Sequence, residues 1–175
     1  MTAVDTDTDR ERKSAAVPRI TPNLWFDKEA EDAAKFYCSV FPNSEITNVL
    51  YYTDSAPGPT GTVVTVDFVL DGQPYTGING GPAFTFTEAV SLLINCADQA
   101  EVDHYWERLL ADGGEASMCG WLKDRYGLSW QVVPTPAYDL LADPDPQRKD
   151  RAMTAMMRMR KIDLAAMQAA ADGRA

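Results

Sequence analysis

The chain has little of the side-chain chemistry on which most metalloenzymes depend. Its 175 residues include a single histidine, His104. Zinc and non-haem iron sites usually take two or three imidazoles, so this scarcity argues against such a site. The three cysteines, Cys38, Cys96 and Cys119, are an odd number, and no two of them have metal-ligand spacing. We therefore expect free thiols and a reducing compartment.

Long apolar runs and excess positive charge are also missing. No apolar run approaches the ~20 residues of a membrane span, and the N-terminus lacks the apolar core of a signal peptide. Acidic residues outnumber basic ones by 26 to 16, for a formal net charge of −10. Such a surface repels nucleic-acid phosphates and anionic lipids. We expect a cytoplasmic protein with no nucleic-acid partner and no membrane partner.

What the chain does contain is an internal near-repeat. The segment that starts at Ala30 reads AEDAAKFYCSVFPNSE, and the segment that starts at Ala100 reads AEVDHYWERLLADGGE. Each follows a short apolar run, 24–26 in the first case and 92–94 in the second. A strand–helix–strands unit used twice predicts two half-cores packed against each other, an arrangement that usually shapes a cavity.

Hydrophobic periodicity predicts the first βαβββ module within residues 18–86. Its expected elements are a strand at 20–26, a helix at 28–41 and strands at 46–53, 62–70 and 73–78. Asp71-Gly72 is a typical two-residue hairpin turn, in which both residues take positive φ. The glycine-rich run 77–81 is interpreted as a turn, because no helix begins behind it to form a phosphate site.

The second module is predicted at 87–134. It has a strand at 88–96, a helix whose start is marked by the Asp98–Glu101 capping box, and strands at 115–122 and 128–133. Gly113 suits the C′ position of that helix.

Two tails flank the modules in this prediction. Residues 1–17 are polar and lack periodicity, which is typical of a disordered tail. Residues 135–175 should form helices, the first with Thr135 as N-cap and Pro136 behind it, a second at 148–160 rich in methionine, and a third capped by Asp163 with Ile162 and Met167 as a hydrophobic staple. The methionine-rich helix either covers its own sheet or docks another subunit.

Two residues are considered for catalysis from the pattern alone. His104 lies in mid-helix and is interpreted as a surface residue, because no Ser-His-Asp or Cys-His arrangement can be built from it. Cys119 begins the aromatic-rich segment CGWLKDRYGLSW. On a strand facing a cavity it would be nucleophilic if its pKa were lowered; the favoured interpretation is a small buried hydrophobe.

The chain resembles a known family through four segments: ITPNLWFDKEAEDAAKFYCSVFPNSEI, SLLINCADQAEVDHYWERLLADGGE, CGWLKDRYGLSWQVVPT and RAMTAMMRMRKIDLAAM. Together they are similar to the PhnB-like branch of the vicinal oxygen chelate superfamily, over about residues 18–170. The superfamily includes glyoxalase I, bleomycin-resistance proteins, fosfomycin-resistance enzymes and extradiol dioxygenases. Branch members are often labelled 3-demethylubiquinone-9 3-methyltransferase. That label fits this chain poorly, because the sequence has no recognisable S-adenosylmethionine site.

The resemblance implies an α+β fold in which two βαβββ modules form curled mixed sheets, a homodimer, and a site near the interface. In metal-using members a divalent ion is held by His and Glu side chains on the strands. The aligned positions here are Ser91, Gln131 and either Thr21 or Pro22, so the resemblance implies that the usual ligands are lost, and no cofactor is expected. Glu88 and Gln131 are the remaining weak candidates for a divalent metal.

We therefore expect a small-molecule-binding protein without a catalytic metal. The candidate ligand-binding residues are Trp25, Ser91, Asn95, Cys119, Trp121 and Gln131. One alternative is an enzyme of the same fold, a lyase, isomerase or transferase acting on a small oxygenated substrate, with Cys119 or a metal as its reactive group. Another is a dimerisation module without a ligand. Neither the ligand nor the dimer geometry follows from the sequence.

Overall fold

The computed structural model describes residues 19–174, so the predicted tail at 1–17 lies outside the described residues. The first module contains β1 (Asn23–Phe26), α1 (Ala30–Val40), β2 (Glu45–Tyr51), β3 (Val63–Leu70) and β4 (Gln73–Asn79). These strands form sheet A in the order β1-β4-β3-β2, with β1 parallel to β4 and the other pairs antiparallel. Helix α1 covers one face, on which Val66, Phe68 and Leu70 alternate as core residues.

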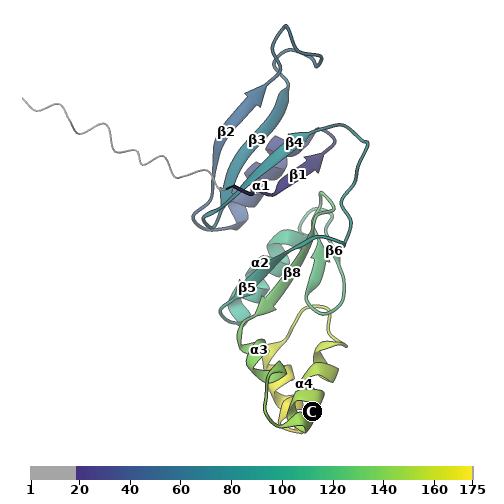
Figure 1. Cartoon of the computed structure of the whole chain (residues 1–175). Coiled ribbons are helices and arrows are strands. Elements are labelled where there is room, and N and C mark those ends of the chain that lie inside the picture. Colours follow the sequence, from purple (N-terminus) through teal and green to yellow (C-terminus); the bar gives the residue numbers. More distant parts are fainter. Residues whose placement is uncertain (1–18, 175) are drawn as a thin grey trace, which may run out of the picture.

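The second module repeats this topology. It contains β5 (Ser91–Cys96), α2 (Gln99–Leu110), β6 (Glu115–Ala116), β7 (Trp121–Lys123) and β8 (Ser129–Pro134), and its sheet B has the order β5-β8-β7-β6. Two four-stranded mixed sheets, each with its own helix, confirm the predicted α+β fold of paired βαβββ modules (Figure 1).

One predicted strand is wrong. The strand expected at 115–122 is interrupted between β6 and β7, where Cys119 has a φ of 57° and Gly120 a φ of 80°. Positive φ is incompatible with an extended strand, so the chain turns there instead. The backbone N–H groups of these two residues donate to the carbonyls of Met159 and Arg160 in the C-terminal segment, at 2.8 and 2.7 Å.

Local turn chemistry explains two boundaries. Asp71 and Gly72, with φ of 44° and 82°, form the predicted two-residue turn between β3 and β4. Behind α2, however, the C′ position belongs to Asp112 (φ 58°), and Gly113 follows it with a φ of 114°. The prediction for Gly113 was therefore wrong by one position, because aspartate also tolerates the left-handed region.

Three helices follow sheet B: α3 (Pro136–Leu141), α4 (Pro146–Met156) and α5 (Leu164–Ala171). They build a separate small core in which Ile162 and Met167 are both fully buried, as the predicted staple requires. The Asp163 carboxylate caps α5 by accepting from Ala166 N at 2.9 Å. Thr135 is the N-cap of α3 and Pro136 occupies the first turn, as predicted, but the Thr135 side chain makes no cap hydrogen bond.

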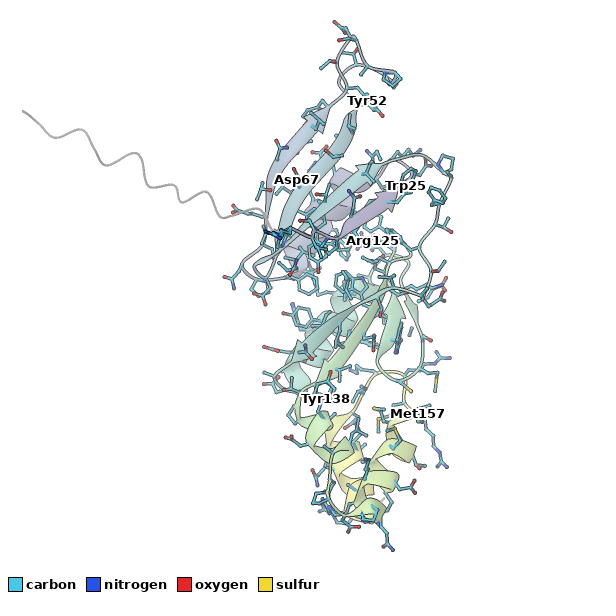
Figure 2. The ribbon with its side chains drawn as sticks, viewed as in Figure 1. Trp25, Tyr52, Asp67, Arg125, Tyr138 and Met157 are labelled. Carbon is cyan, nitrogen blue, oxygen red and sulfur yellow. The ribbon has the colours of Figure 1, made fainter. Side chains whose placement is uncertain are left out.

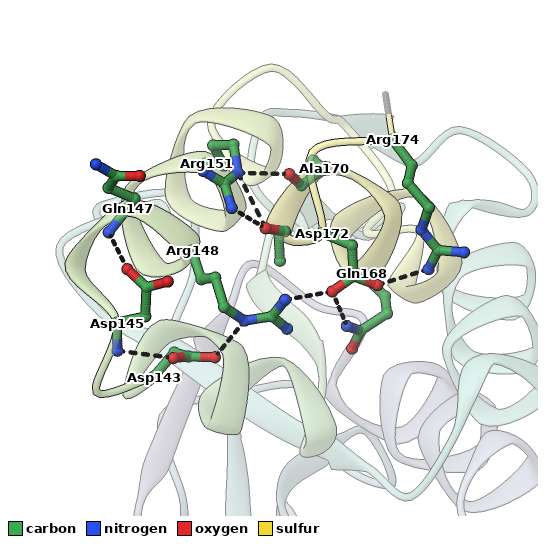
Figure 3. A network of polar contacts seen from close by, with 10 residues as sticks. Asp143, Asp145, Gln147, Arg148, Arg151, Gln168, Ala170, Asp172 and Arg174 are labelled. Atoms are coloured by element: carbon green, nitrogen blue, oxygen red, sulfur yellow. Dashed lines mark hydrogen bonds and ion pairs between the residues drawn. The ribbon is translucent and has the colours of Figure 1, made fainter.

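A polar network locks α4 to the end of α5 (Figure 3). Arg148 Nε donates to Asp143 Oδ2 at 3.0 Å, and its Nη1 donates to Asp172. Arg151 Nε donates to the carbonyl oxygen of Ala171 at 2.9 Å, in the last turn of α5. The hydrogen bond from Arg148 is the main reason that the pKa of Asp172 falls to about 2. The C-terminal helices lie at the far end of the second module (Figure 1).

A buried carboxylate joins the two modules. Asp124, only 3% exposed, accepts from the Tyr37 hydroxyl of α1 and from Trp130 Nε1 of β8, both at 2.8 Å. Its other oxygen accepts the backbone N–H groups of Tyr126 and Leu128, at 2.8 and 3.1 Å. Burial raises the pKa of Asp124, while these hydrogen bonds act in the opposite direction. The modules therefore share one core around a fully hydrogen-bonded acid.

Candidate functional site

Three of the predicted ligand-binding residues meet on the outer face of sheet B, the face opposite α2. Gln131 of β8 lies directly across from Trp121 of β7, and Gln131 Nε2 donates to Ser91 Oγ of β5 at 2.8 Å. Trp130 and Val132 alternate with Gln131 and point into the core. Strand pairing alone thus joins residues that are 40 positions apart in the sequence.

Asn95 lies further along the same face of β5. Its Oδ1 accepts from the Tyr138 hydroxyl of α3 at 3.1 Å; Tyr138 is labelled in Figure 2. The first C-terminal helix therefore holds the side chain of one candidate residue.

Trp25 and Cys119 lie away from this group. Trp25 belongs to β1 of sheet A, and its Nε1 donates to the carbonyl of Gly81 at 2.8 Å. Cys119 occupies the turn between β6 and β7, not a strand, and its Sγ lies 3.6 Å from Met157 Sδ. The structure brings four of the six candidate residues to sheet B and leaves these two at other places.

The edge of sheet B opens into a cavity of about 620 Å³, here called the β5-edge cavity. Ser91 and Asn95 line it together with residues of the β3–β4 hairpin and α2. Its volume lies within the range of pockets for drug-sized ligands. The cavity residues are Phe41, Pro42, Leu70, Asp71, Gln73, Tyr75, 91–95, Glu101, Tyr105 and Trp130.

An aromatic stack forms one wall of the β5-edge cavity. The ring centroid of Phe41 lies 5.1 Å from that of Tyr105 and 5.3 Å from that of Trp130, and the planes are nearly parallel. Burial raises the pKa values of Tyr75 and Tyr105. Both phenols consequently stay neutral at physiological pH and keep a hydrogen to donate.

The sequence reasoning missed these aromatic wall residues as candidates. Phe41 ends the helix expected at 28–41, and Tyr105 lies in the helix expected behind the Asp98–Glu101 capping box. The spacing of apolar residues could not tell a core position from a cavity wall, because on a helix both kinds of position lie on the apolar face.

His104, the only histidine, is exposed on α2, which agrees with its interpretation as a surface residue.

No described helix is long and apolar enough to cross a membrane.

The residues at the family's metal positions do not fit a transition metal. Ser91 and Gln131 offer a hydroxyl and an amide that bond to each other, and neutral oxygen donors alone make a poor site. Glu88 is engaged by Lys123 at 2.7 Å, and this hydrogen bond is the main reason that the pKa of Glu88 is lowered. Within residues 19–174, no group of three His, Cys, Asp or Glu side chains is arranged to hold a metal ion.

Comparison with known proteins gives a consistent picture. The family model described as 3-demethylubiquinone-9 3-methyltransferase matches residues 18–133. A PhnB protein from Bacillus cereus, described as a putative 3-demethylubiquinone-9 3-methyltransferase, is 37% identical, with a TM-score of 0.62 over 67% of this chain and 100% of that one. Protein PA1353 from Pseudomonas aeruginosa is 21% identical, with a TM-score of 0.53 over 65% and 95% of the two chains.

A search of curated proteins found no match. The family match ends at residue 133, so the C-terminal helices lie beyond it. Because the family model covers both βαβββ modules and the B. cereus relative is covered over its full length, the chain belongs to the 3-demethylubiquinone-9 3-methyltransferase family of PhnB-like proteins.

Proposed function

We propose that this protein binds a small organic molecule in the β5-edge cavity. The observation that carries the proposal is that Ser91 and Asn95, two residues expected to bind a ligand, line one cavity of about 620 Å³. Tyr105 and the stacked rings behind it supply apolar surface, while the hydroxyl and amide groups orient the ligand. Gln131 acts indirectly, by holding the Ser91 hydroxyl.

The binding site is proposed to work without a resident metal. The donors at the family's ligand positions are neutral, and Glu88 is neutralised by Lys123. Elemental analysis and thermal melting with Mn²⁺, Fe²⁺, Co²⁺, Ni²⁺ or Zn²⁺, before and after chelator treatment, test this point. Stoichiometric metal, or a melting point raised by one ion, would refute it and favour the enzymatic alternative.

We further propose that the chain is not an S-adenosylmethionine methyltransferase, despite the family's description. Strands β2, β3 and β4 are joined without intervening helices, so the alternating strand–helix pattern of a nucleotide fold is missing from sheet A. The glycine-rich run ends β4, and a Cβ at Gly80 would lie 2.2 Å from the Trp25 ring, so this glycine serves packing.

Assembly and location are part of the proposal. We propose a homodimer formed through the outer sheet faces, where Leu50 and Leu93 are 52% and 48% exposed on their strands. Light scattering after size exclusion should give twice the chain mass of 19.3 kDa. A cytoplasmic location is supported by the three free cysteines among the described residues.

The binding proposal is tested by ligand-observed NMR with a library of monocyclic aromatic compounds. Ser91→Trp places an indole in the β5-edge cavity and should abolish binding of the compounds that the unmodified protein retains. Ser55→Trp, in the exposed β2–β3 loop, is the matched control and should leave binding intact. Compounds that bind all three proteins equally, or a library without a single binder, would refute the proposal.

A further inference from the structure

A second cavity, of about 740 Å³, lies where the linker between the modules crosses the end of β1. It is separate from the β5-edge cavity, and we call it the linker cavity. Aromatic side chains reach it from three segments: Trp25 and Phe26 from β1, Phe84 and Phe86 from the linker, and Tyr126 from the turn before β8. Trp25 and Arg125, another lining residue, mark the region in Figure 2.

The rings are held in edge-to-face pairs. Phe84 meets Trp25 with centroids 5.0 Å apart and planes at 77°, and Phe86 meets Phe26 at 5.3 Å and 74°. Such pairs leave ring faces unstacked, and the face of an aromatic ring is its negative part. Phe84 is 66% exposed, so part of its ring surface is accessible to a ligand.

Trp25 is fixed in place before any ligand binds. Its Nε1 donates to the Gly81 carbonyl at 2.8 Å, and its ring lies so close to Gly80 that no Cβ fits there. The glycine-rich run of the sequence therefore shapes this wall of the linker cavity. A prepositioned ring loses little conformational entropy on binding.

The charges that line the linker cavity are mostly negative. The positive charge of Arg125 is already neutralised, because its Nη2 pairs with Asp112 Oδ2 at 2.8 Å. Its guanidinium carbon also lies 4.2 Å from the ring centroid of Phe36. The carboxylates of Asp27 and Glu29 remain. They outweigh the roughly half positive charge at the nearby N-terminus of α1. A cation is therefore favoured in this cavity, and an anion is repelled.

We propose that the linker cavity is a binding site for an organic cation of the quaternary ammonium class. The methylated ammonium would lie over the faces of Trp25 and Phe84, and Asp27 and Glu29 would supply the counter-charge. Cation–π attraction acts when a cation lies within about 6 Å of a ring centroid, which the cavity of about 740 Å³ allows. The site is independent of the function proposed for the β5-edge cavity.

Calorimetric titration with choline and with 3,3-dimethylbutan-1-ol tests the charge requirement, since the two probes share shape and differ in charge. Choline should bind about tenfold more tightly, the factor expected from one cation–π and carboxylate contact. Equal affinities, or no choline binding at millimolar concentration, would overturn the proposal.

Variants of the full chain test the location. Phe84→Ala and the pair Asp27→Asn with Glu29→Gln should each weaken choline binding about fivefold or more. Met118→Ala, at an exposed apolar position between β6 and β7, is the control and should change nothing. Choline binding that survives Phe84→Ala would place the site elsewhere and refute the assignment. Ser91→Trp should leave choline binding intact, which separates this site from the β5-edge cavity.

Discussion

Replacing Tyr37 by phenylalanine should weaken the junction between the two modules. The ring of Tyr37 is fully buried, and its hydroxyl donates to Asp124 Oδ2 at 2.8 Å. Tyr37→Phe removes one oxygen atom, keeps the packing and leaves Trp130 as the only side-chain donor to that carboxylate oxygen. The change therefore isolates a single hydrogen bond across the module boundary.

The expected loss follows from the kind of bond. A hydrogen bond to a charged, buried acceptor contributes about 1.5–3 kcal/mol. For a chain of this size each kcal/mol shifts the melting temperature by about 2–4 °C, so a loss of about 2 kcal/mol predicts a fall of about 4–8 °C at neutral pH.

The pH dependence has a defined sign. Burial raises the pKa of Asp124 above its unfolded value, so the folded state binds this proton more tightly. The contribution of Asp124 to stability is therefore greatest below the unfolded pKa and decreases as pH rises through the folded pKa. Losing a donor raises the folded pKa further. The stability deficit of Tyr37→Phe should consequently be larger at neutral pH than at acidic pH.

Urea unfolding at several pH values, with calorimetric melting, measures this effect. Tyr75→Phe is the matched control, because no hydrogen bond of the Tyr75 hydroxyl is found among the described residues, and it should cost less than ~0.5 kcal/mol. Equal midpoints for the two variants would show that the Tyr37–Asp124 bond does not stabilise the junction. An unchanged deficit across the pH range would contradict the assigned role of the Asp124 charge.

Three further predictions concern turns and the C-terminal helices. The Arg148 hydrogen bond holds the pKa of Asp172 at about 2, so the stabilisation from the Asp172 carboxylate is complete above the unfolded pKa and is lost as pH falls toward 2. Amides of α4 and α5 should therefore lose protection from hydrogen exchange in acid. Unchanged protection would refute this. Gly120→Ala puts a Cβ 2.7 Å from a backbone carbonyl of β8, whereas Gly127→Ala shares the positive φ in open space; the first should lower the urea midpoint more, and equal midpoints would contradict the clash. Asp163→Ala removes the α5 cap and should lower the free energy of unfolding, measured in urea, by ~1 kcal/mol. Asp163→Asn should keep most of the stabilisation that the cap provides.

The amino-acid sequence by itself determined that the chain contains two βαβββ modules. Alternating and helical periodicities depend only on the neighbours of each residue, so the strands and helices of both repeats could be predicted. The turn at Asp71-Gly72 and the cap at Asp163 are similarly local, because each depends on a side chain or φ value within a few residues. The interruption at Cys119 was missed, because its backbone N–H bonds to a carbonyl 40 positions later, at Met159.

Only the tertiary structure decided which of these residues form a site. The resemblance pointed to six candidate residues, and strand pairing placed Ser91 and Gln131 in contact while Trp25 went to the linker cavity. Nothing in the spacing marked Asp124 as the acid that joins the modules, since its partner Tyr37 is 87 positions away. The physical reason is the same in each case: periodicity assigns a residue to a face, but the neighbour across that face comes from a distant segment whose position is set by packing of the whole core.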